Sequence, residues 1–239
     1  MEIIKLKPPQ PWAKPRILPA FDFQISGVLR IPKLAQQKLL PLDQVLNTRK
    51  SRREFKTPLT FQQLGDLLWH SSRVRESRRL TRNIMWQSKP SPSGGGCHPI
   101  QLLVLRAPVL KNALLIYDPE HHVFGVRELP NSKFLRRCLQ EIEMCLEIHE
   151  GTVLWFVADL ARSGARYRNP ESLAWRDSGA LLATMGLVAE SMALECCGLG
   201  FHDIPFLRRF LKLDQSVIGV GGCVIGGAML NPKSKMGTA

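Results

Sequence analysis

Residues 171–197, ESLAWRDSGALLATMGLVAESMALECC, are the longest stretch of the chain with regular apolar spacing. Apolar residues recur at helical intervals and cover most of the circumference. A helix of this kind is buried on nearly all sides, and Gly198 directly after it is a common helix terminator. The stretch therefore predicts a long central helix around which the rest of the fold is arranged.

Short apolar runs on both sides of this helix predict the strands of one sheet. They are QLLVLRA at 101–107, ALLIYDP at 113–119, HHVFGVREL at 121–129, TVLWFVAD at 152–159 and SVIGVGGCVIGG at 216–227. The second and third runs are joined at a turn dipeptide, while helical segments separate others. Hairpins and crossovers together predict an α+β fold with a mixed central sheet flanked by helices.

Cap residues predict where two of the flanking helices begin. Thr60 is followed three residues later by Gln63, which is a capping-box pattern ahead of an apolar run. Asn131 or Ser132 caps a further helix that is expected to reach about His149.

Other segments carry weaker signals. A helix is expected over 35–47, with a start that Pro41 delays, and a short helix over 204–213. The basic stretch 71–92 has no regular spacing and is expected to be irregular.

Prolines at 8, 9, 11, 15, 19 and 32 mark residues 1–33 as an extended arm, which leaves 34–239 as a single domain. The chain has no run of eighteen or more uninterrupted apolar residues, so no membrane span is expected. Its start is too rich in proline for a secretory signal, which favours a cytoplasmic protein.

The net charge of +13 has two interpretations. A basic face binds nucleic acid through counterion release, whereas dedicated anion sites need only local clusters. The basic residues are spread along the chain and are densest at 49–53 and 73–82. Aromatic residues are not interleaved with them as stacking platforms. This pattern favours anion sites over a nucleic-acid surface.

The six cysteines form no CxxC pair, and no histidine stands at metal-ligand spacing from them. We therefore expect reduced, mostly buried thiols and no metal site.

The segment Arg49-Lys50-Ser51-Arg52-Arg53 follows a predicted helix. If it is extended, Arg49, Ser51 and Arg53 share one face, because alternate side chains of an extended chain point the same way. A guanidinium group matches phosphate oxygens bidentately. The segment is a candidate phosphate site, and the alternative is a solvated basic turn.

The run Gly94-Gly95-Gly96 after Pro92-Ser93 lets the backbone approach a flat ligand closely. It is neither a dinucleotide fingerprint nor a P-loop, and a plain flexible loop is the alternative. Lys233 and Lys235 alternate after the last strand, where they form either an anion site or a solvated tail.

Three motifs follow one another along the chain. They are Arg-x-Ser-x-Arg-x-Phe at 49–55, Pro-Ser followed by a second proline at 92–99, and a long apolar helix ahead of Gly-Leu-Gly at 198–200. Their order resembles that of the nitroreductase-like flavoprotein superfamily. The passages LLWHSS, PSPSGGGCHPIQLLVL, YDPEHHVF and DSGALLATMGLVAESMALECCGLG resemble its SagB-type branch, the azoline dehydrogenases that form thiazoles and oxazoles. The resemblance covers roughly residues 42–235.

The resemblance implies an obligate homodimer that binds FMN at the subunit interface. The residues that it places around FMN are Arg49, Lys50, Ser51, Arg53, Lys233 and Lys235 at the phosphate, Pro92, Ser93, Gly94 and Gly96 along the ring, and Leu199 and Gly200 at its reactive side. Gly96 stands where many members have an asparagine that contacts the flavin. The cofactor supplies the hydride chemistry, so neither a metal nor a catalytic triad is required.

Tyr167 and Arg166 are the catalytic candidates that the resemblance implies. Azoline-oxidising relatives have a Lys-Tyr pair here that is thought to assist proton removal, and arginine replaces the lysine in this chain. Because arginine stays charged, the role of base falls to Tyr167, with a phenolate that neighbouring arginines favour. The alternative is a structural tyrosine at the subunit interface. His98 and His202 are candidate substrate contacts.

The expected function is FMN-dependent oxidation of thiazoline or oxazoline rings in a peptide or another natural product. A cyclase or synthetase is a candidate partner. The first alternative is an NAD(P)H-dependent reductase of nitroaromatics or quinones. The second is a basic nucleic-acid-binding or partner-binding protein with a degenerate flavin site.

Overall fold

The computed structural model describes residues 7–14, 16, 21–35, 39–81, 84–201 and 203–227. Its strands are β1 (Gln10–Pro11), β2 (Gly27–Arg30), β3 (Glu76–Thr81), β4 (Ile84–Ser88), β5 (Ile100–Leu105), β6 (Ala113–Asp118), β7 (Val123–Glu128), β8 (Thr152–Asp159), β9 (Tyr167–Arg168), β10 (Leu194–Leu199) and β11 (Val217–Gly227). Its helices are α1 (Leu42–Thr48), α2 (Phe61–Ser72), the 3-10 turn η1 (Gly94–Gly96), α3 (Ser132–Glu143), α4 (Leu160–Gly164), α5 (Glu171–Ser191) and α6 (Pro205–Leu211).

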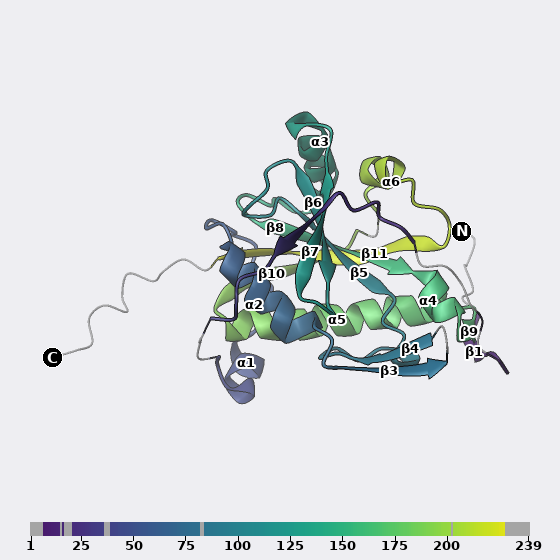
Figure 1. The fold of residues 1–239 in the computed structure, drawn as a ribbon. Helices are drawn as coiled ribbons and strands as arrows, with labels where there is room; N and C mark the ends of the chain where they lie inside the picture. The colour runs from purple at the N-terminus through teal and green to yellow at the C-terminus, as the bar shows by residue number, and fades with distance from the viewer. Residues whose placement is uncertain are drawn as a thin grey trace, which may run out of the picture.

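A seven-stranded sheet in the order β10-β11-β8-β5-β6-β7-β2 forms the centre of the fold. Helices α2 and α5 cover its lower face in the view of Figure 1, and α3 and α6 lie above it. Two small sheets, β1 with β9 and β3 with β4, lie beside this framework. The predicted α+β class is therefore confirmed.

The sheet separates two apolar cores because successive residues of a strand point to opposite faces. In β8, Leu154 and Phe156 join the core between the sheet and helices α2 and α5. Their neighbours Trp155 and Val157 join the second core, against α3 and α6. All eight residues of β8 are buried, as its continuous apolar run predicted.

The sheet is antiparallel rather than mixed. Every pairing among the described strands is antiparallel, so the predicted mixture is wrong. Strands β5, β6 and β7 follow one another as adjacent antiparallel neighbours, and the chain then passes through α3 and returns as β8 beside β5 in the opposite direction.

Helix α5 is the central helix that the sequence predicted, but its predicted end is wrong. It ends at Ser191 instead of Cys197, and Ala193 adopts a left-handed backbone with φ of 55°. Residues 194–199 then form β10, which pairs with β11. A short apolar run fits a buried helix or a buried strand equally well, and here pairing with β11 decides the structure.

The stretch 71–92 is not irregular, because β3 and β4 form a hairpin in it. Arg78 lies opposite Trp86 across the two strands, with its guanidinium 5.5 Å from the centre of the indole ring. Contacts of this kind stabilise a strand pair that composition alone does not reveal.

The predicted helix starts are mostly confirmed. The capping box of Thr60 and Gln63 opens α2, and Asn131 caps α3, which ends at Glu143 before the predicted end. Helix α1 begins at Leu42, directly after Pro41. No helix in the described ranges is long and apolar enough to cross a membrane.

The described parts of residues 1–33 add strands to the domain. β2 pairs with β7 at one edge of the central sheet, and β1 pairs with β9 next to Tyr167. The indole of Trp12 also donates a hydrogen bond of 2.9 Å to the carbonyl of Gly164. These contacts place the N-terminal part of the chain beside one of the predicted catalytic residues.

Candidate functional site

A groove of about 610 Å³ runs along one side of α5 and contains most of the predicted phosphate site. It is lined by Arg49, Lys50, Ser51 and Arg53 from the segment after α1, and by Leu199 and Gly200 at the end of β10. The structure thus brings together two predicted parts of the site that are about 150 residues apart in the sequence.

The segment 49–53 is held in place by its one inward arginine. Arg52 forms an ion pair of 2.8 Å with the buried Glu190 of α5, and its backbone N–H donates to the carbonyl of Cys196. Among the described residues, no ion pair involves Arg49, Lys50 or Arg53. Their positive charges are therefore available to an anion in the groove.

The α5 side of the groove has two glycines that leave its surface open. Gly179 and Gly186 line the groove, and a Cβ atom added to either would meet nothing within 4 Å. A concave site of this volume is within the range that holds cofactors.

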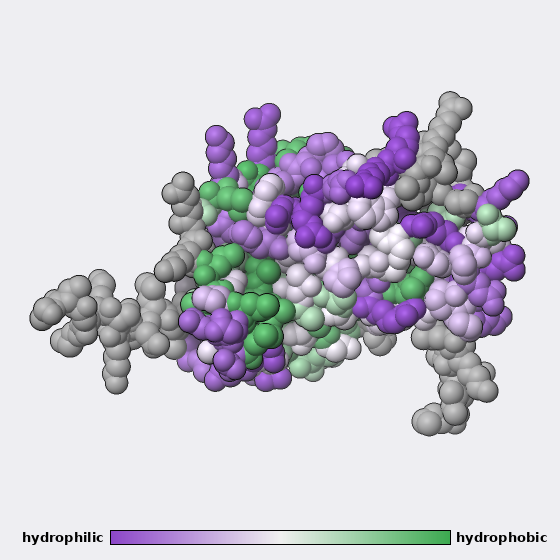
Figure 2. Space-filling model, turned by 90° about the horizontal axis from the view of Figure 1, so that it is seen from below, coloured by the Kyte–Doolittle hydropathy of each residue, from purple (hydrophilic) through white to green (hydrophobic). Residues whose placement is uncertain are grey.

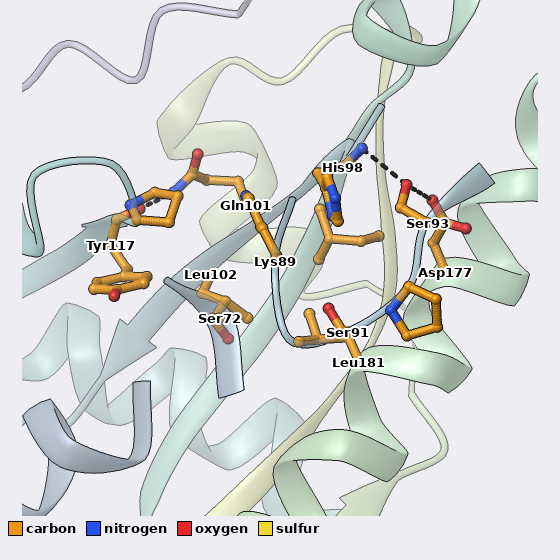
Figure 3. Close-up of a pocket in the computed structure, with 13 residues that line it drawn as sticks. Ser72, Lys89, Ser91, Ser93, His98, Gln101, Leu102, Tyr117, Asp177 and Leu181 are labelled. Atoms are coloured by element: carbon orange, nitrogen blue, oxygen red, sulfur yellow. Dashed lines mark hydrogen bonds between the residues drawn. The ribbon is translucent and has the colours of Figure 1, made fainter. Parts of the chain in front are cut away.

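The predicted strip along the flavin ring, residues 92–96, is anchored to α5 through Asp177. The hydroxyl of Ser93 donates a 2.5 Å hydrogen bond to Asp177, and the N–H of Gly94 donates a second bond of 2.9 Å. Ser93 Oγ in turn accepts the backbone N–H of His98 (Figure 3). Burial of Asp177 raises the pKa of its carboxyl group, and these hydrogen bonds partly oppose that effect.

Glycine is required in the strip because the side chains of Leu173, Tyr167 and Trp86 lie where Cβ atoms at positions 94, 95 and 96 would be. Gly95 and Gly96 have φ of 62° and 63°, which favours glycine. A Cβ atom on Gly96 would lie 2.5 Å from the indole nitrogen of Trp86, and one on Gly94 would lie 2.8 Å from Leu173. The indole of Trp86 therefore fills the space that a side chain at position 96 would need.

Tyr167 and Arg166 both contact this strip. The hydroxyl of Tyr167 lies against the α-carbon side of Gly95, and the guanidinium of Arg166 donates a hydrogen bond to the carbonyl of Gly95. Arg168 points elsewhere, with its guanidinium 4.4 Å from the centre of the Trp12 ring. Of the two arginines that flank Tyr167, Arg166 is thus the one at the strip.

His98 is buried behind the strip. Its Nε2 lies 3.0 Å from the carbonyl of Gln87, and burial together with the charge of Lys89 lowers its pKa to about 4. The ring is therefore neutral near pH 7, and Nε2 carries the proton that it donates to this carbonyl. His98 lines a small cavity with Pro92 and Ser93, and not the groove.

The groove and the strip lie on different sides of α5 within one chain. Leu182 and Gly186 line the groove, whereas Asp177 and Leu181 line the cavity behind the strip. Within one chain the structure therefore does not place the predicted phosphate residues and the strip 92–96 in one hollow, although Leu199 and Gly200 line the groove with the phosphate residues. His202, Lys233 and Lys235 lie outside the described residues.

Three residues of the site were missed from the sequence. Asp177 anchors the strip, Glu190 anchors Arg52, and Trp86 packs against Gly96. A carboxylate inside the apolar stretch of α5 was an available signal for the first two, because a buried charge in a helix needs a partner. No group of three or more potential metal ligands occurs in the described chain.

Comparison with known proteins identifies the family of the chain. The nitroreductase family model matches residues 46–227, a range that contains the groove segment, the strip and α5. The chain belongs to the nitroreductase family. It is accordingly an oxidoreductase, and proteins of this family typically bind FMN.

Solved nitroreductase-family structures share the fold. A putative nitroreductase from Ralstonia eutropha is 24% identical, with a TM-score of 0.64 over 94% of this chain and 100% of that chain. A putative nitroreductase from Anabaena variabilis is 20% identical, with a TM-score of 0.61. The match covers 90% of this chain but only 41% of that chain. The search of curated proteins gave no match.

A third similar structure is the Escherichia coli microcin synthetase McbBCD complex with truncated pro-MccB17 bound. It is 17% identical, with a TM-score of 0.57 over 89% of this chain and 78% of that chain. Similarity at these levels of identity establishes the fold.

Proposed function

We propose that this nitroreductase-family oxidoreductase binds FMN with the phosphate at Arg49, Ser51 and Arg53. The observation that carries the proposal is the set of unpaired cationic side chains and one hydroxyl in a single groove. Arginine and serine donors suit phosphate oxygens, and the open glycines of α5 leave room for the rest of the molecule. The residues present therefore fit the cofactor that the family typically binds.

The separation of groove and strip supports a homodimer as part of the proposal. One chain offers the phosphate groove on one side of α5 and the strip on another, so a second copy can bring its strip over the first copy's groove. Leu42 and Leu46 of α1 are 63% and 62% exposed. Figure 2 shows a hydrophobic area on the underside of the molecule, on the side where Figure 1 places α1. Such a patch is typical of a subunit interface.

The proposed reaction is the oxidation of an azoline ring in a peptide or another natural product to the azole. Aromatisation removes one hydride and one proton from the ring. When bound, FMN supplies the two-electron acceptor for the hydride. Tyr167 is the proposed proton acceptor, because its hydroxyl lies against Gly95 of the strip.

Arg166 has a positioning role in this proposal. Its guanidinium is bound to the carbonyl of Gly95, so it holds the strip and the Tyr167 segment together. An arginine stays protonated at working pH and cannot replace the lysine of the azoline-oxidising relatives as a base. The similarity of the fold to a microcin synthetase complex is the reason to propose a cyclase or synthetase partner.

Purified protein tests the proposal in two steps. Flavin absorbance with one FMN per chain is expected, and a protein that binds no FMN on reconstitution contradicts the cofactor assignment. The FMN-bound protein is then given a thiazoline peptide in single-turnover experiments. Bleaching of the flavin with loss of two mass units from the peptide supports azoline oxidation. Reduction by NAD(P)H and turnover with a quinone, without azoline oxidation, would support the reductase alternative.

A further inference from the structure

A small cavity lies behind the strip and contains a lysine that no described group neutralises. The cavity has a volume of about 30 Å³ and is lined by residues of α2, the segment 89–93, β5 and α5. Lys89 lines it with only 8% of its surface exposed. Figure 3 shows the Lys89 side chain between Gln101 and His98. Among the described residues, its ammonium group has no ion pair.

The charges around Lys89 do not compensate for its burial. Arg162 of α4 is close enough to repel it, and the carboxylates that attract it are Asp118 and Glu120. Asp118 is already paired with His121 at 2.8 Å. Around Lys89 the described residues thus include one cation that repels it and two carboxylates that attract it, but neither carboxylate forms an ion pair with its ammonium group.

Asp177 also lines the cavity, but its carboxylate is hydrogen-bonded to the strip and is not among the groups that act on the charge of Lys89. One oxygen accepts from Ser93 and the other from the N–H of Gly94. His98 is neutral near pH 7 for the reasons given above, so it offers Lys89 no negative charge. A buried ammonium group without an ion pair is energetically costly, so Lys89 either loses its proton or takes up an anion as its counter-ion.

The hydroxyl groups of the cavity supply a hydrogen-bond donor. Ser71 donates to the carbonyl of Leu67, so Ser72 must donate to Ser71 and has no proton left for a ligand. Ser91 is only 5% exposed and its hydroxyl has no hydrogen bond among the described residues. Lys89 and Ser91 are therefore two donors that share one cavity.

We propose that this cavity binds a small monovalent anion, with Lys89 as its counter-ion and Ser91 as a hydrogen-bond donor. The volume exceeds the 10–15 Å³ or so that one water molecule requires, which leaves room for a halide, a formate ion or the carboxylate end of a larger molecule.

An adjoining hollow offers space for the body of a larger carboxylate. It has a volume of about 340 Å³ and shares Gln101, Tyr117 and Pro119 with the cavity. Apolar side chains such as Phe21 and Phe23 line it together with Arg162, and its polar lining also includes the carboxylates Asp22, Asp118 and Glu120. The anion thus has two possible sources, a free ion or a carboxylate with an apolar body.

Binding should weaken above neutral pH. Burial and the charge of Arg162 lower the pKa of Lys89 to about 7, while Asp118 and Glu120 act against that shift. The ammonium group is charged below this pKa and is lost above it. Affinity for the anion is therefore expected to be constant at acidic pH and to fall about tenfold per pH unit above 7.

Thermal unfolding with sodium formate tests the site. The wild-type midpoint at pH 6 should rise by about 5–10 °C when formate reaches ~100 times its Kd, and the rise should be much smaller at pH 9. Lys89→Met should remove the formate effect. Lys111→Met, which replaces an exposed lysine elsewhere, should keep it and controls for general effects of salt. Equal formate effects in wild type and Lys89→Met overturn the proposal.

Two further measurements identify the source and the place of the anion. Hexanoate in place of formate should stabilise wild type only if the adjoining hollow accepts an apolar body, whereas formate alone points to a free ion. Wild-type crystals soaked in bromide should give an anomalous peak between Lys89 and Ser91. The absence of this peak overturns the proposal even if Lys89→Met does not fold.

Discussion

The hydroxyl of Ser93 donates a hydrogen bond of 2.5 Å to the carboxylate of Asp177, a residue 84 positions later in the chain. The same carboxylate accepts the N–H of Gly94 at 2.9 Å. One buried side chain of α5 thus fixes two consecutive residues of the strip, so the position of the strip depends directly on the position of the central helix.

Replacing Asp177 should therefore loosen the strip. Asp177→Ala leaves the proton of the Ser93 hydroxyl and the Gly94 N–H without an acceptor and should lower the free energy of unfolding by about 1–3 kcal/mol. Asp177→Asn keeps an acceptor for Gly94 and should cost less. Urea denaturation at a fixed protein concentration measures both variants, and an equal loss in the two would contradict the role of the carboxylate as acceptor.

His98 should make the protein less stable in acid. Its pKa is lowered from 6.5 to about 4 by burial and by Lys89, so the unfolded chain binds a proton before the folded chain does. This contribution is fully present above pH 6.5 and is lost as the pH falls towards 4, by up to about 3 kcal/mol. His98→Gln should flatten the dependence of unfolding free energy on pH within this window.

His121 provides an internal contrast for that experiment. The carboxylate of Asp118 raises the pKa of this exposed histidine, so its contribution is present at low pH and is lost as the pH rises through the raised pKa. His121→Gln should therefore remove a dependence of opposite sign. If His121→Gln and His98→Gln change the pH profile in the same direction, the assignment to His98 is wrong.

Two adjacent arginines should have separate roles. Arg53→Ala should weaken FMN binding by about 1.5–3 kcal/mol in a fluorescence titration, because it removes a charged donor from the groove. Arg52→Ala should instead lower stability, because it leaves the buried Glu190 without its partner. Arg136→Ala, an exposed arginine on α3, controls for loss of positive charge. Unchanged FMN affinity in Arg53→Ala would falsify the phosphate assignment.

Tyr167→Phe tests the proposed base. The variant should keep FMN and lose azoline oxidation by ~10²–10⁴-fold, the usual contribution of general base catalysis. Flavin reduction by an artificial hydride donor should be largely unchanged, because that reaction needs no proton acceptor at this position. If Tyr167→Phe oxidises azolines at the parental rate, Tyr167 only packs against Gly95.

A charge on α1 should disrupt the proposed dimer. Leu46→Lys places an ammonium group in the exposed apolar area and leaves the buried residue of α1, Val45, unchanged. Light scattering at micromolar concentration should give a dimer for wild type and a shift towards monomer for the variant. Lys substitution of the 82% exposed Met144, far from α1, should leave the mass unchanged. A monomeric wild type would contradict the dimer.

The sequence predicted those parts of the fold that depend on residues close together in the chain. The capping box at Thr60, the cap at Asn131 and the apolar run of β8 are patterns within a few residues of one another. In the segment 49–53, Arg49, Ser51 and Arg53 line one groove, but Lys50 between them lines it as well, so the lining does not follow the predicted alternation alone.

The parts that were missed depend on contacts between distant residues. Residues 194–199 form a strand because β11 lies beside them, although their apolar pattern also continued the helix. The hairpin of β3 and β4 was not predicted, because its arginines interrupt the apolar pattern that indicates a strand. The bond between Ser93 and Asp177 joins residues 84 positions apart, and no pattern in one sequence reports such a pair.

The contact between Trp12 and Gly164 also has a consequence for synthesis of the protein. The two residues are 152 positions apart. At a translation rate of roughly 5–20 residues per second, the segment around Trp12 is synthesised roughly 8–30 s before its partner. During that interval the indole N–H of Trp12 and the edge of β1 lack their native hydrogen-bond partners, so a nascent chain exposes them to chaperones and to other nascent chains. Slow decoding between residues 12 and 164 would lengthen this exposure, and the yield of native protein should then depend on codon choice in the middle of the gene.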